Sequence, residues 1–279
     1  MSNLLSVLCA GNVRRGFLLL SLLLGSGAYA QTTVLESVRF SESAAALTHQ
    51  GGFALSGNPA LFALDSHNVV TLAVVPSRLG VQEMRTVHAI GVVHSGQYAV
   101  ALQIGSMPST IYNELASCLH LSARLTDQFS AGIGAEYMRA AAQGFAPRSR
   151  IALNAGVAYT LSPSVRLGGG IRNITQSSLG ADVLTVAQRG HIGVGIAAQS
   201  DLFFDIDLIA VTTRQSGLCV AVKYVPLDIL SIRAALSGVP RSIEAGVLLE
   251  PYGGLSVQAT AQYHDVLGVS SMIGVGLLW

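Results

Sequence analysis

Apolar and polar side chains alternate with a period of two along most of this chain, from residue 97 to the end. Successive side chains of a β-strand point to opposite faces, so each segment has one apolar face and one polar or small face. The last segment shows this most clearly, because alternate positions from Val269 to Trp279 are apolar apart from Ser271. The pattern predicts strands rather than helices.

About fourteen such segments can be counted, including two early ones, 69–75 and 87–94, whose two faces are hard to tell apart. After Asn68 no segment has the period of an amphipathic helix. We therefore expect an all-β, antiparallel architecture.

The connections between the predicted strands fall into two alternating sets. One set holds only tight turns, such as Ser162-Pro163-Ser164. The other set holds all the long connections, which are 77–86, 106–113, 140–149 and 174–187. Outer-membrane barrels combine an even strand number with short periplasmic turns and longer external loops. This segregation predicts a barrel with both termini at the periplasmic end.

Aromatic residues lie near the ends of several apolar faces, as in the interfacial girdles of membrane barrels. They are Tyr98, Tyr137, Tyr159, Tyr224, Tyr263 and Trp279. We predict a transmembrane antiparallel β-barrel over residues 68–279, preceded by residues 31–67. The alternative is a soluble, exported β-sandwich, in which strands alternate in the same way.

The first thirty residues read as a signal peptide. Arg14 and Arg15 precede the apolar stretch 17–24, and Ala28-Tyr29-Ala30 supplies a cleavage site. The terminal Trp279 ends an alternating strand and resembles the signal for outer-membrane insertion. We therefore expect an outer-membrane protein that meets the barrel assembly machinery and membrane lipid.

Composition narrows the function classes. Charged residues make up 11% of the chain, net charge is +1, and Lys223 is the single lysine. Nucleic-acid binding needs a basic stripe that this chain lacks. In the exported chain two cysteines remain, Cys118 and Cys219, and we expect them to stay unpaired because they fall within separate predicted strands.

Neither catalytic nor metal-binding signatures occur, so we expect no enzyme activity, no cofactor and no metal. His120, His191 and His264 fall on the predicted inner face without defining a constellation. Only His88 and His94 have a short spacing on one face.

The predicted inner face carries most of the charge. Its ionisable residues are Arg124, Glu136, Arg150, Arg166, Arg172, Asp205, Asp207, Lys223, Arg233 and Glu244. They form either an internal network of ion pairs that fills the lumen or a polar path through it. Glycines on the same face, Gly168, Gly170, Gly193 and Gly195, either leave room for another segment or mark strand curvature.

The order of motifs resembles the PorV/PorQ family of outer-membrane barrels, which is related in shape to the FadL transporters. The matching motifs are Gly51-Gly52, the run 57–61 (Gly-Asn-Pro-Ala-Leu), the pair of strands 151–161 and 165–173, and the closing region from Tyr263. The resemblance covers roughly residues 38–279. The chain departs from it at 53–56, where Phe-Ala-Leu-Ser replaces an acidic stretch.

The resemblance implies a fourteen-stranded barrel whose N-terminal segment folds into the lumen. Its plug or hatch residues would be Gly51, Gly52, Asn58, Pro59 and Ala60. PorV-like proteins serve type IX secretion or surface attachment, with secretion components as partners. The alternative is a FadL-like channel for a hydrophobic ligand, and a purely structural barrel is a third reading.

Overall fold

The computed structural model describes residues 34–38, 43–49, 51–78, 81–178, 187–212, 216–238, 241–265 and 268–279. The predicted signal peptide, residues 1–30, lies outside the described residues. Among the residues that are described, no helix has the length and apolar character needed to cross a membrane.

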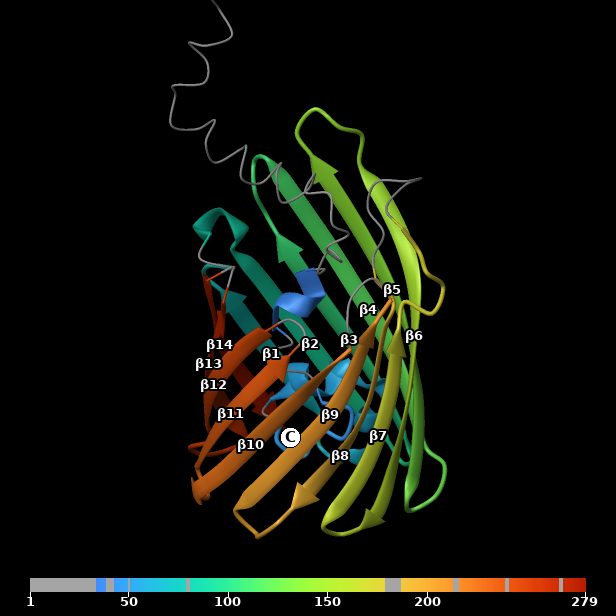
Figure 1. The fold of residues 1–279 in the computed structure, drawn as a ribbon, viewed down its shortest axis with the longest axis vertical. Helices are drawn as coiled ribbons and strands as arrows, with labels where there is room; N and C mark the ends of the chain where they lie inside the picture. The colour runs from blue at the N-terminus through green and yellow to red at the C-terminus, as the bar shows by residue number, and fades with distance from the viewer. Residues whose placement is uncertain are drawn as a thin grey trace, which may run out of the picture.

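Fourteen antiparallel strands form one closed barrel, in which each strand pairs with its neighbours in sequence and β1 pairs with β14 (Figure 1). The strands are β1 (Val69–Val75), β2 (Thr86–Ser95), β3 (Tyr98–Met107), β4 (Tyr112–Arg124), β5 (Phe129–Ala142), β6 (Arg148–Ser162), β7 (Val165–Arg172), β8 (Arg189–Ala197), β9 (Leu202–Val211), β10 (Gly217–Leu227), β11 (Leu230–Gly238), β12 (Arg241–Leu249), β13 (Leu255–His264) and β14 (Gly268–Leu278). The predicted fold class is confirmed.

The barrel closes where the first strand meets the last. Val69 pairs with Leu278 in the β1–β14 register. Just outside it, the backbones of Asn68 and Trp279 exchange two hydrogen bonds of 3.1 Å. Closure leaves no free sheet edge, as a chain in hydrocarbon requires.

Burial along the strands follows the predicted alternation. In β12 the buried and exposed side chains alternate at every residue, with Ile243, Val247 and Leu249 exposed and Glu244 buried. Apolar side chains therefore point outward and polar ones inward, which is the reverse of a water-soluble barrel. Such an outer face suits lipid.

The first two strands alternate as well, although their sequences leave the faces unclear. In β1 the inward residues include Val69, Ala73 and Val75. These pack in a cluster with Phe53 and Phe62 from the segment that precedes the barrel. Both faces of β1 are apolar because one meets lipid and the other meets this internal cluster.

The two rims of the barrel differ. The short-turn rim has the connections 96–97, 125–128, 163–164, 198–201, 228–229 and 250–254. The opposite, long-loop rim includes the connections 76–85 and 173–188. Two loops predicted there, 106–113 and 140–149, are shorter than expected, because β3 to β6 extend through much of them. Figure 1 shows these strands rising above the rest of the wall.

Short 3-10 helices in the described residues before β1 lie within the barrel, where they are drawn in blue in Figure 1. They are η2 (Val34–Val38), η3 (Gly52–Gly57) and η4 (Pro59–Leu64), and η5 (Gln82–Met84) follows in the β1–β2 connection. Helix η4 packs against β4, β5 and β6, whereas η2 packs mainly against β2, β3 and β4. We call the described residues between 34 and 67 the N-terminal segment.

Candidate functional site

The N-terminal segment is joined to the wall through Asn58, which is completely buried. Its amide nitrogen donates hydrogen bonds to the carbonyl oxygens of Ala44, at 2.8 Å, and Val157 of β6, at 3.0 Å. Its side-chain oxygen accepts a bond from the backbone N–H of Ala60, 3.1 Å away, and so caps η4. Asn at an N-cap satisfies an otherwise unpaired helix donor. One side chain thus ties two parts of the segment to the barrel.

Inward glycines let the backbone of the segment touch the wall. A Cβ at Gly132 would lie 2.6 Å from the carbonyl oxygen of Pro59. A Cβ at Gly156 would overlap the Asn58 side chain, and one at Gly168 would overlap the carbonyl group of Ala44. Of the two readings of the inner-face glycines, the structure supports close approach of another segment at Gly168.

Gly51 and Gly52 lie on the other side of the lumen. Gly51 has a φ of 73°, and a Cβ there would overlap the amide of Gln258 on β13. Gly52 is buried near Thr71 and Ile90. The five residues expected in the plug therefore all belong to the N-terminal segment and lie inside the barrel. Their role as a hatch stays a prediction.

Two aspartates of β9 bind the loop 43–49 through its backbone. Asp205 accepts hydrogen bonds from the N–H of Leu47 at 3.1 Å, the N–H of Thr48 at 2.8 Å and the Thr48 hydroxyl at 2.6 Å. Asp207 accepts one from the N–H of Ala44 at 2.7 Å. These four hydrogen bonds to two carboxyl groups, which we call the latch, hold the loop against the wall.

Other inner-face charges form ion pairs. The Arg150 guanidinium lies 2.9 Å from the Glu136 carboxylate, and Arg233 binds Glu244 on the neighbouring strand. Arg172 lies 3.0 Å from Glu36 of η2, and that pair joins the wall to the N-terminal segment.

Three further residues complete the predicted set. Arg166 donates to the carbonyl oxygen of Ala45 at 3.3 Å, and the Lys223 ammonium lies 4.4 Å from the centre of the Phe203 ring. Arg124 differs from the other nine, because it is exposed at the end of β4 on the short-turn rim. Its position in the strand alternation is inward, but as the last residue of β4 it lies at the rim. For most of the set, an internal network describes the geometry better than an open polar path.

Near the long-loop rim, η2 packs into a cluster of apolar side chains that we call the methionine pocket. Val34 and Leu35 are fully buried there, with Met84 and Tyr112 partly buried at its edge. The wall residues that complete it are Met107, Ala116, Cys118, Met138 and Ala140. Methionine is flexible and polarizable and adapts to differently shaped partners. The pocket is apolar, and a short helix with no core of its own fills it.

Polar contacts fix η2 above this pocket. The N–H of Val34 donates to the Glu114 carboxylate, and the Ser37 hydroxyl lies 2.9 Å from Nε2 of His88. Arg78, in the β1–β2 connection, is buried nearby; burial lowers the pKa of its guanidinium, while the charges of Glu114 and Glu36 raise it.

Several of these residues are absent from the set predicted by sequence. Glu114 follows the predicted connection 106–113, in a stretch before Leu119 whose faces the sequence pattern did not assign; extending the alternation back from His120 would have placed it inward. Arg189 lies two residues before His191 in β8 and shows the same signal. Glu36 and Thr48 precede the barrel, where no periodicity identifies them.

The histidines and cysteines are dispersed. Within the described part of the chain, no group of three or more metal-ligating side chains lies together. His88 contacts Ser37, whereas His94 hydrogen bonds the carbonyl oxygen of Phe62. Cys118 and Cys219 are buried thiols on separate strands, β4 and β10, and do not form a disulfide with each other.

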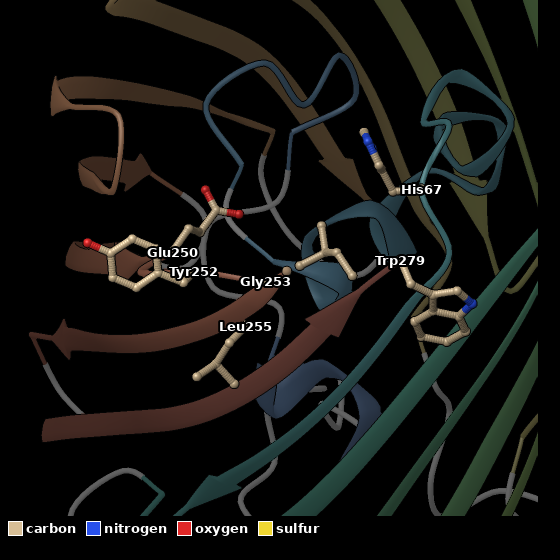
Figure 2. Close-up of a pocket in the computed structure, with 8 residues that line it drawn as sticks. His67, Glu250, Tyr252, Gly253, Leu255 and Trp279 are labelled. Atoms are coloured by element: carbon tan, nitrogen blue, oxygen red, sulfur yellow. The ribbon is translucent and has the colours of Figure 1, made fainter.

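A cavity of about 370 Å³ opens at the short-turn rim (Figure 2). Its walls come from the β12–β13 turn, the residue before Asn68 and the end of the chain. The lining residues are His67, Glu250, Tyr252, Gly253, Gly254, Leu255, Leu278 and Trp279.

Comparison with known proteins places this geometry among outer-membrane barrels. No family model matches the sequence, and no curated protein does. The toluene transporter TbuX of Ralstonia pickettii superposes with a TM-score of 0.61 at 10% identity, covering 89% of this chain and 97% of that one. The toluene transporter TodX of Pseudomonas putida gives 0.60 at 8% identity, with 89% and 96% covered. A FadL homologue of Pseudomonas aeruginosa gives 0.57 at 12% identity, with 89% and 98% covered.

At such identities the likeness concerns the fold and not the activity. Of these three structures, two are named as toluene transporters and one as a FadL homologue, and none of the three is named as a PorV or PorQ protein. The chain thus has the fold of the FadL-like outer-membrane barrels, a closed barrel of fourteen strands.

Proposed function

We propose that this protein is an outer-membrane channel for small hydrophobic molecules, closed in the described state by its N-terminal segment. The observation that carries the proposal is the methionine pocket beside the long-loop rim, which is apolar, faces the lumen and is filled by Val34 and Leu35 of η2. Ligand pockets are mostly apolar, with few polar groups.

The way the segment is fastened supports a stepwise opening. Residues 58–60 lie against Gly132 of β5 and Gly156 of β6. Residues 34–38 and 43–49 are held mainly by hydrogen bonds to Glu114, Asp205 and Asp207, and Ala44 also lies against Gly168. A hydrophobic ligand that competes with η2 for the pocket would free this outer part while residues 58–64 stay in place.

The functions named for the structural neighbours favour this reading over secretion. They are toluene transporters and a FadL homologue, in agreement with the channel reading of the sequence. No contact in the described lumen favours the secretion or surface-attachment reading, so it is not taken further.

The test is uptake by intact cells, because the lipopolysaccharide leaflet is the barrier that a hydrocarbon channel must bypass. Cells that produce the protein should take up radiolabelled toluene faster than matched cells that lack it. Entry of a hydrophilic sugar of similar mass should be equal in both. Equal toluene uptake in both strains would reject the channel function.

A second experiment separates the channel from the secretion reading. The barrel is isolated from detergent-solubilised outer membranes, and the molecules that accompany it are identified. A channel should bring apolar small molecules or nothing. Stoichiometric recovery of export components would instead support the secretion reading.

A further inference from the structure

The cavity at the short-turn rim lies on the opposite end of the barrel from the methionine pocket and has no part in the proposed channel. Its form is fixed by the backbone. Gly253 and Gly254 have φ values of 63° and 78°, and Leu278 donates its N–H to the carbonyl oxygen of Gly254 at 2.8 Å. A Cβ at Gly254 would overlap the carbonyl oxygen of Leu278. The β12–β13 turn is thus held against the end of β14 by backbone contacts, and these contacts fix the shape of the cup between them.

The lining of this cup combines one carboxylate with two exposed aromatic rings. Tyr252 is 88% exposed and Trp279 is 59% exposed. Glu250 supplies the negative charge and lies on the same turn as Tyr252 (Figure 2). A carboxylate beside an aromatic face attracts an organic ammonium group. On the other side of the cup, Nδ1 of His67 lies 3.3 Å from the Asp65 carboxylate, so this side also carries negative charge and favours a cation.

The position of the cup identifies the source of such a ligand. Leu255 and Trp279 stand on the outward, lipid-facing side of β13 and β14, at the end of the apolar band. Short turns mark the periplasmic side, and a tryptophan at such an end lies at the level of the lipid head groups. A group bound here with its ammonium at Glu250 would direct its hydrocarbon part along Leu255 and Leu277.

From this arrangement we propose that the cup binds the head group of a zwitterionic aminophospholipid from the periplasmic leaflet. Glu250 and Tyr252 receive the ammonium. The lipid anchors the seam where the first and last strands meet, because Trp279 belongs to both the cup and that seam.

Trp279 provides the measurement, since it is the one tryptophan in the sequence. The full mature barrel is folded into phosphatidylcholine bilayers that contain a fixed fraction of brominated phosphatidylethanolamine or brominated phosphatidylglycerol. Bromine quenches tryptophan fluorescence at contact. The ethanolamine lipid should quench Trp279 about two- to fivefold more effectively at low mole fraction, as an exposed cation–π contact implies.

The matched variants are Glu250→Gln and Asp228→Asn, the latter in the β10–β11 turn of the same rim. Glu250→Gln should abolish the difference between the two lipids, whereas Asp228→Asn should preserve it. Each barrel is first shown to be folded by its heat-modifiable electrophoretic mobility. Equal quenching by both lipids in the unaltered protein, stronger quenching by the glycerol lipid, or an unchanged difference in Glu250→Gln would overturn the proposal. These outcomes are independent of toluene uptake, so the channel function stands or falls separately.

Discussion

The side-chain nitrogen of Asn58 lies 3.0 Å from the carbonyl oxygen of Val157, a residue of strand β6. The backbone carbonyls of a strand normally accept hydrogen bonds from the neighbouring strand. Here a strand carbonyl accepts one from a side chain of the N-terminal segment, which joins that segment directly to the barrel wall. Ninety-nine residues separate the two partners in sequence. The position of the segment thus depends on a contact between two parts of the chain that lie far apart in sequence.

Replacing Asn58 by Ala should loosen that seat. The change removes an N-cap, worth about 1 kcal/mol, and two hydrogen bonds to the carbonyl groups of Ala44 and Val157, each worth about 0.5–1.5 kcal/mol. We expect a folded barrel in which residues 43–64 become accessible to protease from the periplasmic side. Asn113→Ala, at an exposed position of β4, is the matched change. Equal protease resistance of both variants would show that Asn58 does not hold the segment.

Gly156 tests close approach without removing any hydrogen-bonding group. A Cβ at this position would overlap the Asn58 side chain. Gly156→Val should therefore displace η4, while the backbone of β6 still pairs with β5 and β7. Gly169 faces outward, and a Cβ there would have its nearest neighbours at 3.7 Å or more; Gly169→Val should be tolerated. Ion conductance in planar bilayers should rise for Gly156→Val and stay at the unaltered level for Gly169→Val. An unchanged conductance in Gly156→Val would mean that the contact at β6 does not close the lumen.

Asp205 carries the largest share of the latch on residues 43–49. Asp205→Ala removes three hydrogen bonds, each worth about 0.5–1.5 kcal/mol. The loop should then leave the wall. An Ala45→Cys reporter, buried in the unaltered protein, should react with a water-soluble maleimide in Asp205→Ala and remain protected with Asp228→Ala. Protection in both backgrounds would mean that the latch lies elsewhere.

The sequence predicts the barrel because lipid imposes a simple rule on every strand. In β12 an outward Ile243 is followed by an inward Glu244. The other strands alternate in the same way, and the short turns keep apolar residues on the outer face from one strand to the next. The same rule fails above the membrane. Ala140, Ala141 and Ala142 continue β5 beyond Tyr137, but small residues carry no alternation, so the height of this hairpin could not be predicted.

From the sequence we could predict that a segment lies inside the barrel, but not where it contacts the wall. Inward glycines such as Gly168 indicated that something approaches the wall, yet the same residues are compatible with curvature. What approaches is decided by pairs such as Ala44 with Asp207, which are 163 residues apart in sequence. Such pairs depend on closure of the barrel and leave no local pattern.

Trp279 should matter for assembly more than for stability of the finished barrel. Its backbone pairs with Asn68 at the seam, and its exposed ring ends the lipid-facing side of β14. Trp279→Ala keeps the backbone pair and removes the terminal aromatic group, so we expect slower insertion in cells but an ordinary unfolding midpoint in urea once refolded. Tyr252→Ala removes an aromatic ring from the same rim without changing the terminus. A similar loss of outer-membrane yield in both would assign the effect to the rim and not to a terminal signal.

The contact between Leu35 and the methionine pocket provides a direct test of how the channel is closed. Leu35→Ser withdraws a fully buried side chain from Met107 and Met138, at a cost of about 1.5–3 kcal/mol to the seat of η2. Toluene should then enter cells faster than through the unaltered protein, because less free energy is needed to vacate the pocket. Leu61→Ser makes the same chemical change in η4, within a separate cluster formed with Ala60 and Ala158. If both variants accelerate entry equally, general loosening of the lumen accounts for the effect, whereas acceleration by Leu35→Ser alone locates the closing contact at η2.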